Sequence, residues 1–582
     1  MSLRLKISAI LITLLVACQP STEQGTNETE NDNPKLATSV NGMVAAAQPL
    51  ATQAGNAILE AGGNAADAAV ATAFVLAVVE PTMNGIGGRS QILVRKTDGS
   101  FQGYNGMTEV PASYVLPDEP LASGHGTVGT PGVVAALMRL HKEHGSMPLE
   151  TLMEAAIRHA AEGFEVLPGE AARHKIAHKA MLANAGFRRQ MLKNDSVLYQ
   201  AGEILKQPDL AQTLKRISET NGRDFYEGET ARQIAEDMKT NGGFVSLEDL
   251  KNYKALDARY ISTDYRGYEI HSIPAPAGGG LIVKALNILE NFDLSGMTDA
   301  QWGAVINQAL AIAMESRFAD YYEPDLDVVK SKSWAAEQAA SIVVPARGPS
   351  QATGFVKPKT SQLLAQQTDW AGDTWEKDSH HTTHFVTADC QGMVVSITQT
   401  VGPLFGSKVI TPGTGFVYAS TMGSYLSSSD QAPGSRPRTT IAPTVVTKDG
   451  ETVMVLGAAG GIRILSGIVQ TISRSIDRGM TLEAAVAAPR VHPGSTRNME
   501  SRTAVANGMK INAEYTPDNG WATPDSTTWA QAGFDITIVT RYGAFARVHA
   551  ISRDPETNTW TGMADLDWEG TAEGPEDSDC NQ

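Results

Sequence analysis

The pattern of apolar and polar positions predicts a helix-rich first part of the chain. Residues 38–79 are rich in alanine and repeat apolar side chains at helical spacing, and Gly62-Gly63 is placed to end a first helix. Asn64 can cap a second helix over Ala65–Val79, which is apolar nearly all round and is therefore expected to be buried. Helical spacing also dominates residues 132–252.

The pattern changes after residues 342–380, a polar segment that resembles a linker. Residues 382–460 predict short alternating strands with Gly and Pro turns, followed by a helix that Gly479 is placed to end. Strand-like segments return near residues 534–539 and 545–552. Strands and helices do not alternate as βαβ units, which favours sheets covered by helices, an α+β fold, over a doubly wound fold.

Length and charge narrow the class of protein. A chain of 582 residues is too long for one ordinary hydrophobic core and predicts at least two subdomains or one large layered fold. Its formal net charge is -17, from 47 basic and 64 acidic side chains. An acidic protein without basic clusters is a poor candidate for binding nucleic acid or anionic lipid headgroups.

The N-terminus carries a targeting signal. Basic side chains precede an apolar run at residues 7–17 that is too short to span a bilayer. The run ends Leu15-Val16-Ala17-Cys18, which resembles a bacterial lipobox, so residues 1–17 are expected to be a signal peptide and Cys18 to carry lipid. An ordinary signal peptide with an incidental cysteine is the alternative. Residues 18–36 form the lipidated cysteine and a polar, flexible tether in this interpretation.

A β-hairpin is predicted around Gln391. Residues 382–388 are expected to form one strand, 389–393 the turn and 394–400 the returning strand, so that Thr382 lies opposite Thr400. Two facing hydroxyls suit an N-terminal threonine mechanism, in which one is the nucleophile and the other orients it. Cross-strand threonine pairs are also common in ordinary sheets, so this pair alone leaves both interpretations open.

A glycine-rich junction lies further along the chain, at residues 457–461. It follows an expected strand and precedes an expected helix, where backbone N–H groups are unpaired and point at whatever sits there. Glycines let a substrate oxygen approach closely, which makes an oxyanion hole possible. A tight turn without a ligand is the alternative.

Three nearby histidines suggest a metal site at first sight. His380, His381 and His384 have the i and i+4 spacing that needs a helix to share one face, but the residues that follow predict a strand. No supporting carboxylate motif follows. We therefore expect no metal ion and no organic cofactor.

Together these motifs are similar to the γ-glutamyltransferase (glutathione hydrolase) family of N-terminal nucleophile hydrolases. The resemblance runs from about residue 41 to about residue 493. The matching segments, in chain order, are Gly62-Gly63-Asn64-Ala65-Ala66-Asp67-Ala68-Ala69, Val79-Glu80-Pro81, Gly85-Ile86-Gly87-Gly88, Gly129-Thr130-Pro131-Gly132, Phe225-Tyr226-Glu227-Gly228-Glu229, Tyr265-Arg266-Gly267-Tyr268-Glu269, Thr382-Thr383-His384-Phe385, Phe405-Gly406-Ser407, Pro412-Gly413-Thr414-Gly415, Arg436-Pro437 and Gly460-Gly461.

The resemblance implies an αββα sandwich made as one precursor that cuts itself. The scissile bond would be His381–Thr382, giving a heavy chain of residues 37–381 and a light chain of residues 382–582. The freed α-amine of Thr382 would act as general base while its hydroxyl attacks the substrate amide. Thr400 matches the hydroxyl partner of the family, and Gly460 and Gly461 match its oxyanion-hole glycines.

The residues expected to bind the substrate depart from the family pattern. Met107 stands where the family has an arginine for the glutamyl α-carboxylate. Neutral side chains occupy the other matched positions: Thr439 and Thr440 for the paired serines, and Thr421 and Ser424 for the polar and acidic groups that bind the α-amine. Arg89 stands where the family has glycine. It either supplies a relocated cation or faces solvent.

The sequence therefore predicts a lipid-anchored enzyme of the bacterial envelope that faces the periplasm. It would hydrolyse an amide or small peptide, or pass the acyl group to an amine, with the membrane contacted through the lipid alone. Two enzymatic versions stay open: a γ-glutamyl hydrolase with a rearranged clamp, or an acylase for another amide. A catalytically silent binding lipoprotein is the alternative of a different class.

Overall fold

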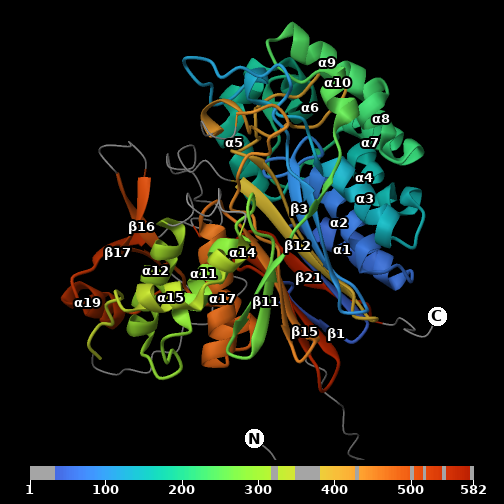
Figure 1. The fold of residues 1–582 in the computed structure, drawn as a ribbon. Coiled ribbons are helices and arrows are strands. Elements are labelled where there is room, and N and C mark those ends of the chain that lie inside the picture. The colour runs from blue at the N-terminus through green and yellow to red at the C-terminus, as the bar shows by residue number, and fades with distance from the viewer. Residues whose placement is uncertain are drawn as a thin grey trace, which may run out of the picture. The chain divides into compact units, whose positions relative to one another are not determined.

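Two seven-stranded sheets form the centre of the computed structural model of the chain (Figure 1). The structure describes residues 33–315, 325–347, 381–426, 431–497, 504–515, 520–539 and 545–576. The expected signal peptide, Cys18 and most of the expected linker lie outside the described residues.

Both sheets are antiparallel, and each mixes strands from the early and late parts of the sequence. In order across the first sheet, the strands are β1 (Leu36–Ser39), β20 (Thr559–Ala564), β19 (Arg547–Asp554), β15 (Glu451–Ala459), β14 (Thr444–Lys448), β11 (Tyr268–Ser272) and β10 (Ile261–Tyr265). Across the second they are β21 (Thr571–Glu573), β2 (Gly42–Ala46), β12 (His381–Asp389), β13 (Val394–Gly402), β3 (Arg89–Arg95), β4 (Phe101–Gly106) and β9 (Leu256–Ala258).

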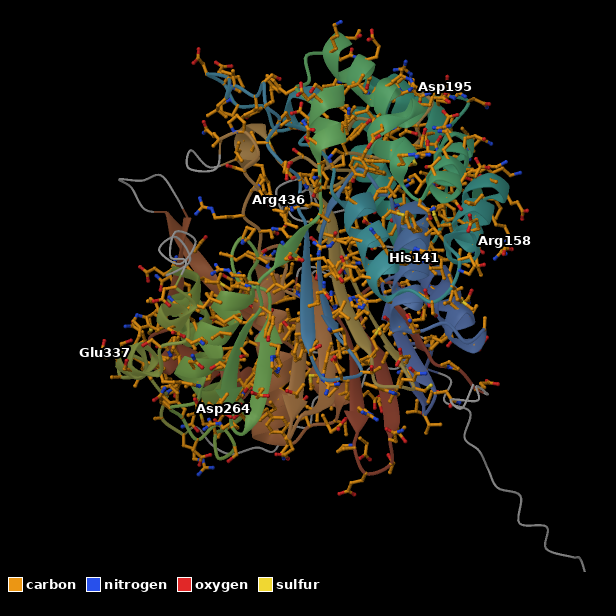
Figure 2. The ribbon with its side chains drawn as sticks, turned by 45° about the vertical axis from the view of Figure 1, so that its right-hand side comes forward. His141, Arg158, Asp195, Asp264, Glu337 and Arg436 are labelled. Atoms are coloured by element: carbon orange, nitrogen blue, oxygen red, sulfur yellow. The ribbon has the colours of Figure 1, made fainter. Side chains whose placement is uncertain are left out.

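Helices cover the outer face of each sheet. Against the second sheet lie α1 (Pro49–Glu60) and α2 (Ala65–Val79), and against the first lie α11 (Gly279–Leu289) and α17 (Arg463–Arg478). Figure 1 shows these two helix pairs on opposite sides of the strands. In Figure 2, His141 and Arg158 mark one outer side, and Asp264 and Glu337 mark the other. This is the αββα arrangement that the resemblance implied, so the expected fold class is confirmed.

Further helices extend the two outer layers. On the side of α1 and α2 these are α3 (Val133–His144), α4 (Leu149–Glu162), α5 (Pro168–Ala183), α6 (Ala185–Met191), α7 (Pro208–Thr220), α8 (Arg223–Glu227), α9 (Glu229–Thr240) and α10 (Leu247–Asn252). On the side of α11 and α17 they are α12 (Asp299–Glu315), α14 (Leu326–Val329), α15 (Lys332–Ala339), α18 (Leu482–Ala487) and α19 (Thr523–Gln531). None of the helices in the described residues is both long and apolar enough to cross a membrane.

Small sheets complete the fold. The three-stranded sheet contains β16 (Val491–Arg497), β17 (Ala504–Glu514) and β18 (Asp535–Val539), and its β17–β18 pair is parallel. Two-stranded sheets form from β5 (Phe164–Glu165) with β8 (Ile204–Leu205), and from β6 (Leu192–Lys193) with β7 (Val197–Leu198).

The two large sheets pack face to face through small and β-branched side chains. Val386 on β12, Val394 on β13 and Val455 on β15 are fully buried members of this inter-sheet core. The two sheets approach closely at Gly457, because an added Cβ would lie 2.3 Å from the His384 ring. The central strands are therefore buried on both faces, which fixes the position of residues at their ends.

Helix α2 follows the sequence expectation closely. Its bounds are those predicted, every one of its residues is buried, and Asn64 forms a capping box with Asp67 at its start. The helical prediction for residues 38–46 was wrong, because these residues lie in β1, β2 and the turn between them. All five residues of β2 are buried, so the strand lacks the apolar–polar alternation that would have distinguished it from a buried helix.

Residues just before the expected start of the heavy chain at residue 37 already contact the body of the protein. Leu36 already belongs to β1, and the buried ammonium of Lys35 donates hydrogen bonds to the carbonyls of Asp565 and Trp568 at 2.8 and 2.6 Å. Burial lowers the pKa of Lys35 to about 8. These contacts hold Lys35 beside the end of β20 in the first sheet.

Candidate active site

The predicted hairpin is present, with β12 and β13 paired in the expected register. Thr383 lies opposite Gln399 and Ala388 opposite Val394. The register shifts at the open end of the hairpin, where Thr400 and Val401 of β13 face the single residue Thr382 of β12. This bulge turns the Thr382 side chain toward Thr400 at the end of two central strands.

A chain of hydrogen bonds links Thr382 to the peptide bond that precedes it. The Thr382 hydroxyl donates to the Thr400 hydroxyl at 3.2 Å, and the Thr400 hydroxyl donates to the carbonyl oxygen of His381 at 2.5 Å. The Gly402 N–H donates to the same Thr400 oxygen at 2.9 Å. A hydroxyl has one hydrogen and two lone pairs, so every hydrogen-bonding position of Thr400 is used. Thr382 and Thr400 are both buried, and their geometry is therefore fixed.

Next to these hydrogen bonds lies a buried ion pair that no sequence pattern connects with Thr382. Arg547 on β19 donates from Nη2 to the backbone carbonyl of Thr382 at 2.7 Å and from Nη1 to Glu80 Oε1 at 3.2 Å. Its guanidinium lies 4.0 Å from the centroid of the Trp568 ring. Burial raises the pKa of Glu80, and the Arg547 charge offsets this only in part.

Glu80 was within a matched segment, Val79-Glu80-Pro81, but nothing in that segment indicates its partner. Arg547 carries no sequence signal, because 467 residues separate it from Glu80. Ala459 on β15 pairs with Arg547 on β19, and this pairing places the glycine-rich junction beside Arg547.

Gly460 and Gly461 form the junction between β15 and α17. Their φ angles are 141° and 59°, in the region that favours glycine, and a Cβ on Gly460 would lie 2.9 Å from Ala546 Cα. No acceptor among the described residues takes a hydrogen bond from the N–H of either glycine. Two adjacent free N–H groups at a strand-to-helix junction are suited to bind an oxyanion.

The residues expected to contact substrate lie in several environments. Thr440 donates to the carbonyl of Gly461 at 2.8 Å, which connects it to the glycine junction, and Thr439 accepts from the Ile441 N–H at 3.3 Å. Met107 is fully buried within the apolar core on the side of α11 and α17.

The two positions matched to the α-amine binders differ in exposure. Thr421 is fully buried, and its hydroxyl accepts a hydrogen bond from Thr108 at 3.0 Å. Ser424 is exposed in the short helical turn Gly423–Tyr425. Neither side chain carries a charge that would bind an ammonium group.

Arg89 does not face solvent, which excludes one of the two interpretations of this side chain. It is 2% exposed and lies directly opposite Thr400 in the pairing of β3 with β13. Its Nη2 donates to the Tyr425 hydroxyl, and its guanidinium lies 4.6 Å from the centroid of the Tyr425 ring.

Two of the three histidines lie on a strand, as expected, and His380 lies outside the described residues. His381 and His384 belong to β12, and His384 shares a hydrogen bond with Thr398 at 2.9 Å. Burial lowers the pKa of His384 to about 3, so this side chain is neutral at physiological pH. Within the described ranges, His, Cys, Asp and Glu side chains form no group of three or more that could hold a metal ion.

Comparison with known proteins identifies a single family. The family model for gamma-glutamyltranspeptidase matches residues 51–574. The chain is 33% identical to the glutathione hydrolase proenzyme of Escherichia coli over 482 residues, which is 78% of this chain and 80% of that protein. It is also 32% identical to the acylase ACY 1 proenzyme of a Pseudomonas species over 480 residues, covering 78% of this chain and 83% of the relative.

A solved structure has the same fold. The crystal structure of cephalosporin acylase from Bacillus halodurans superposes with a TM-score of 0.80 at 29% sequence identity, covering 97% of this chain and all of the other. Both sequence relatives are named as proenzymes.

Proposed function

This chain belongs to the gamma-glutamyltranspeptidase family and is an enzyme of that family, and from this premise we propose that it cuts its own His381–Thr382 bond and then uses Thr382 as the nucleophile. The enzyme forms an acyl-enzyme on Thr382 and passes the acyl group to water or to an amine. Membership of a family of hydrolases and acylases sets aside the binding-only alternative.

The observation that carries the proposal is the hydrogen-bond chain from Thr382 through Thr400 to the carbonyl of His381. Thr400 accepts from the attacking hydroxyl and donates to the oxygen of the carbonyl under attack. It therefore orients the Thr382 oxygen and stabilises the negative charge that develops on the His381 oxygen.

Self-cleavage then proceeds by two exchanges of bonds. The Thr382 oxygen bonds to the His381 carbonyl carbon and loses its proton, and the C–N bond to Thr382 breaks as its nitrogen gains a proton. The product is an ester with a free α-amine. Water adds to the ester and releases the His381 carboxylate and the Thr382 hydroxyl, which restores the nucleophile.

In the mature enzyme the freed α-amine of Thr382 accepts the proton of its own hydroxyl as this attacks the substrate amide. The N–H groups of Gly460 and Gly461 support the next step, because they are free to bind the oxyanion of the tetrahedral intermediate. Thr440 and the carbonyl of Gly461 share a hydrogen bond that holds this junction in place.

A denaturing gel followed by N-terminal sequencing tests the proposal. The purified protein should give two bands, and the smaller should begin at Thr382. Thr382→Ala should remain one full-length chain without amidase activity, whereas Thr382→Ser, which keeps a hydroxyl, should still be cut. A light chain beginning at any other residue, or an active uncut protein, would refute the assignment.

We also propose that the enzyme is attached to the bacterial envelope through lipid on Cys18, with its body in the periplasm. The sequence Leu15-Val16-Ala17-Cys18 and the polar tether after it support this location. Cys18→Ser should release the protein from the membrane fraction or block its maturation. Membrane association and processing that are unchanged in this variant would count against a lipid anchor.

A further inference from the structure

Lys35 lies against a loop that connects the two large sheets. The loop, residues 565–570, follows β20 of the first sheet and precedes β21 of the second. The N–H of Ala564 donates to the carbonyl of Lys35 at 2.8 Å, and the N–H of Ala572 donates to the carbonyl of Pro34 at 3.1 Å. Pro34 and Lys35 therefore bind the backbone on both sides of the loop and hold its two ends together.

The Lys35 ammonium also binds the inside of this loop. Its Nζ donates to the carbonyl oxygens of Asp565, Trp568 and Gly570 at 2.8, 2.6 and 3.4 Å, so all three N–H groups of the ammonium are used within one loop. The Lys35 residue is 4% exposed. Without the ammonium, three carbonyl groups would lose their donor in a buried place, and the loop would have to rearrange.

Trp568 connects the loop to Arg547. Its φ is 73°, a left-handed conformation that a large side chain rarely adopts, and its carbonyl accepts the shortest of the three Lys35 hydrogen bonds. The guanidinium groups of Arg173 and Arg547 lie 3.9 and 4.0 Å from the centroid of its ring. Two groups of this size cannot share one face of a ring at that distance, so the ring lies between them. The position of Arg547 therefore depends on Trp568.

Arg547 in turn contacts the nucleophile residue, because its Nη2 donates to the backbone carbonyl of Thr382 at 2.7 Å. A second contact joins the loop to the same strand. The Asp565 carboxylate accepts a hydrogen bond from the N–H of Val548, the neighbour of Arg547 on β19, at 2.8 Å. Both contacts fix the start of β19, which lies beside Thr382.

Resting on the proposed function of Thr382, we propose that Lys35 is a positioning residue for self-cleavage: it holds the loop 565–570 in the shape that keeps Arg547 on the Thr382 carbonyl. Lys35 acts through Trp568 and Arg547 and takes no part in the exchange of bonds itself. Because Lys35 precedes the cut and the loop follows it, the same contact joins the two products.

Lys35→Met tests the inference, because methionine keeps an unbranched side chain but has no donor. At about pH 7 the precursor, made by cell-free translation, should be cut about tenfold or more slowly than the wild type, since a small displacement of a reacting group lowers its rate strongly. Lys284→Met is the matched control. Lys284 is also 4% exposed, with its ammonium 4.4 Å from the centroid of the Trp334 ring in the outer helix layer, and this variant should be cut at the wild-type rate.

The pH dependence of cutting gives a second test, which does not need the methionine variant to fold. Burial lowers the pKa of Lys35 to about 8. The charged and titratable groups that act on the ammonium are Asp565, Asp567 and Glu569 of the loop and Arg547 and His549 of β19. Arginine keeps its proton where lysine loses it, so the cutting rate of the wild type relative to Lys35→Arg should fall about fivefold between pH 8 and pH 9.

Denaturing gels over time measure the cutting rates, and thermal unfolding in the uncut Thr382→Ala background shows which variants are folded. A folded Lys35→Met that is cut as fast as the wild type, or a wild-type rate that stays constant relative to Lys35→Arg, would overturn the role of Lys35 and leave the function of Thr382 intact. A wild type that is never cut before Thr382 would refute the proposed function and this inference with it.

Discussion

Glu80 and Arg547 form a buried ion pair, with Oε1 and Nη1 3.2 Å apart, whose arginine also binds the backbone carbonyl of Thr382. On the same strand as Arg547, Arg553 makes a pair of equal length with Glu451, but there the carboxylate is 60% exposed. The two pairs share strand, residue types and distance and differ in burial, which makes the second a matched control for the first.

Glu80→Gln should lower the free energy of unfolding by about 3–5 kcal/mol, because it leaves the Arg547 charge buried without a counter-ion. Glu451→Gln should change it by about 1 kcal/mol or less, since water screens the exposed pair. Urea unfolding of both variants and the wild type measures the difference. Equal, small losses would mean that the Glu80–Arg547 pair does not stabilise the fold around Thr382.

Thr400→Val should slow self-cleavage by about 100-fold or more, because valine keeps the shape of threonine but neither orients the Thr382 hydroxyl nor donates to the His381 carbonyl. Thr400→Ser should be cut at a rate close to that of the wild type. The fraction of full-length chain on a denaturing gel over time gives the rates. Thermal unfolding of the uncut valine variant checks that it is folded, and rapid cutting of a folded valine variant would contradict the role of Thr400.

Gly461→Ala should lower kcat by about tenfold or more, because the side chain strains the backbone and displaces an N–H group that would bind the oxyanion. Gly479→Ala is the control: its φ is 61° against 59° for Gly461, and an added Cβ there meets nothing within 4 Å. Both variants should lose stability to a similar extent, about 1–2 kcal/mol. Steady-state kinetics should separate them, and an equal effect on kcat would remove the glycine junction from the mechanism.

The buried pair of Ser466 and His492 makes stability depend on pH. Burial lowers the pKa of His492 from its ordinary value of 6.5 to about 3, and its Nδ1 lies 2.7 Å from the Ser466 hydroxyl oxygen. Between these two pH values the unfolded chain binds a proton at this position and the folded chain does not. Stability contributed by the neutral side chain is therefore lost as pH falls below 6.5.

Replacing His492 should remove this part of the pH dependence. Between pH 7 and pH 5 the free energy of unfolding of the wild type should fall by about 2 kcal/mol more than that of His492→Gln. Urea unfolding at both pH values measures the difference, and parallel losses in the wild type and His492→Gln would show that His492 is not held neutral.

Elements with a distinctive local sequence pattern could be predicted from the sequence. The capping residue and continuous apolar run gave the bounds of α2, and the turn around Gln391 gave the register that joins Thr382 to Thr400. The strand β2 was missed because it is buried on both faces and therefore has no alternation. Gly460 and Gly461 could be predicted as free N–H donors, because a strand-to-helix junction has a recognisable local pattern of glycines.

Long-range partners could not be predicted in this way. The contact of Arg547 with Thr382 depends on the order of strands in two different sheets, and no spacing along the chain encodes it. The burial of Arg89 depends on its pairing with Thr400 and on Tyr425, which lies 336 residues further along the chain. The partners of such residues can be identified only from the assembled sheets.

Both large sheets combine strands from the early and late parts of the chain, and this arrangement affects how the protein refolds after it is cut. A cut before Thr382 leaves strands of the two products side by side in both sheets, so that β12 and β13 lie between β2 and β3, and β14, β15, β19 and β20 lie between β11 and β1. The strands pair while the chain is still continuous, so each pairing between an early and a late strand is intramolecular. After the cut, reassembly becomes bimolecular, and its yield depends on concentration. The mature protein is therefore expected to refold less completely than the uncut chain, and increasingly so as the protein is diluted.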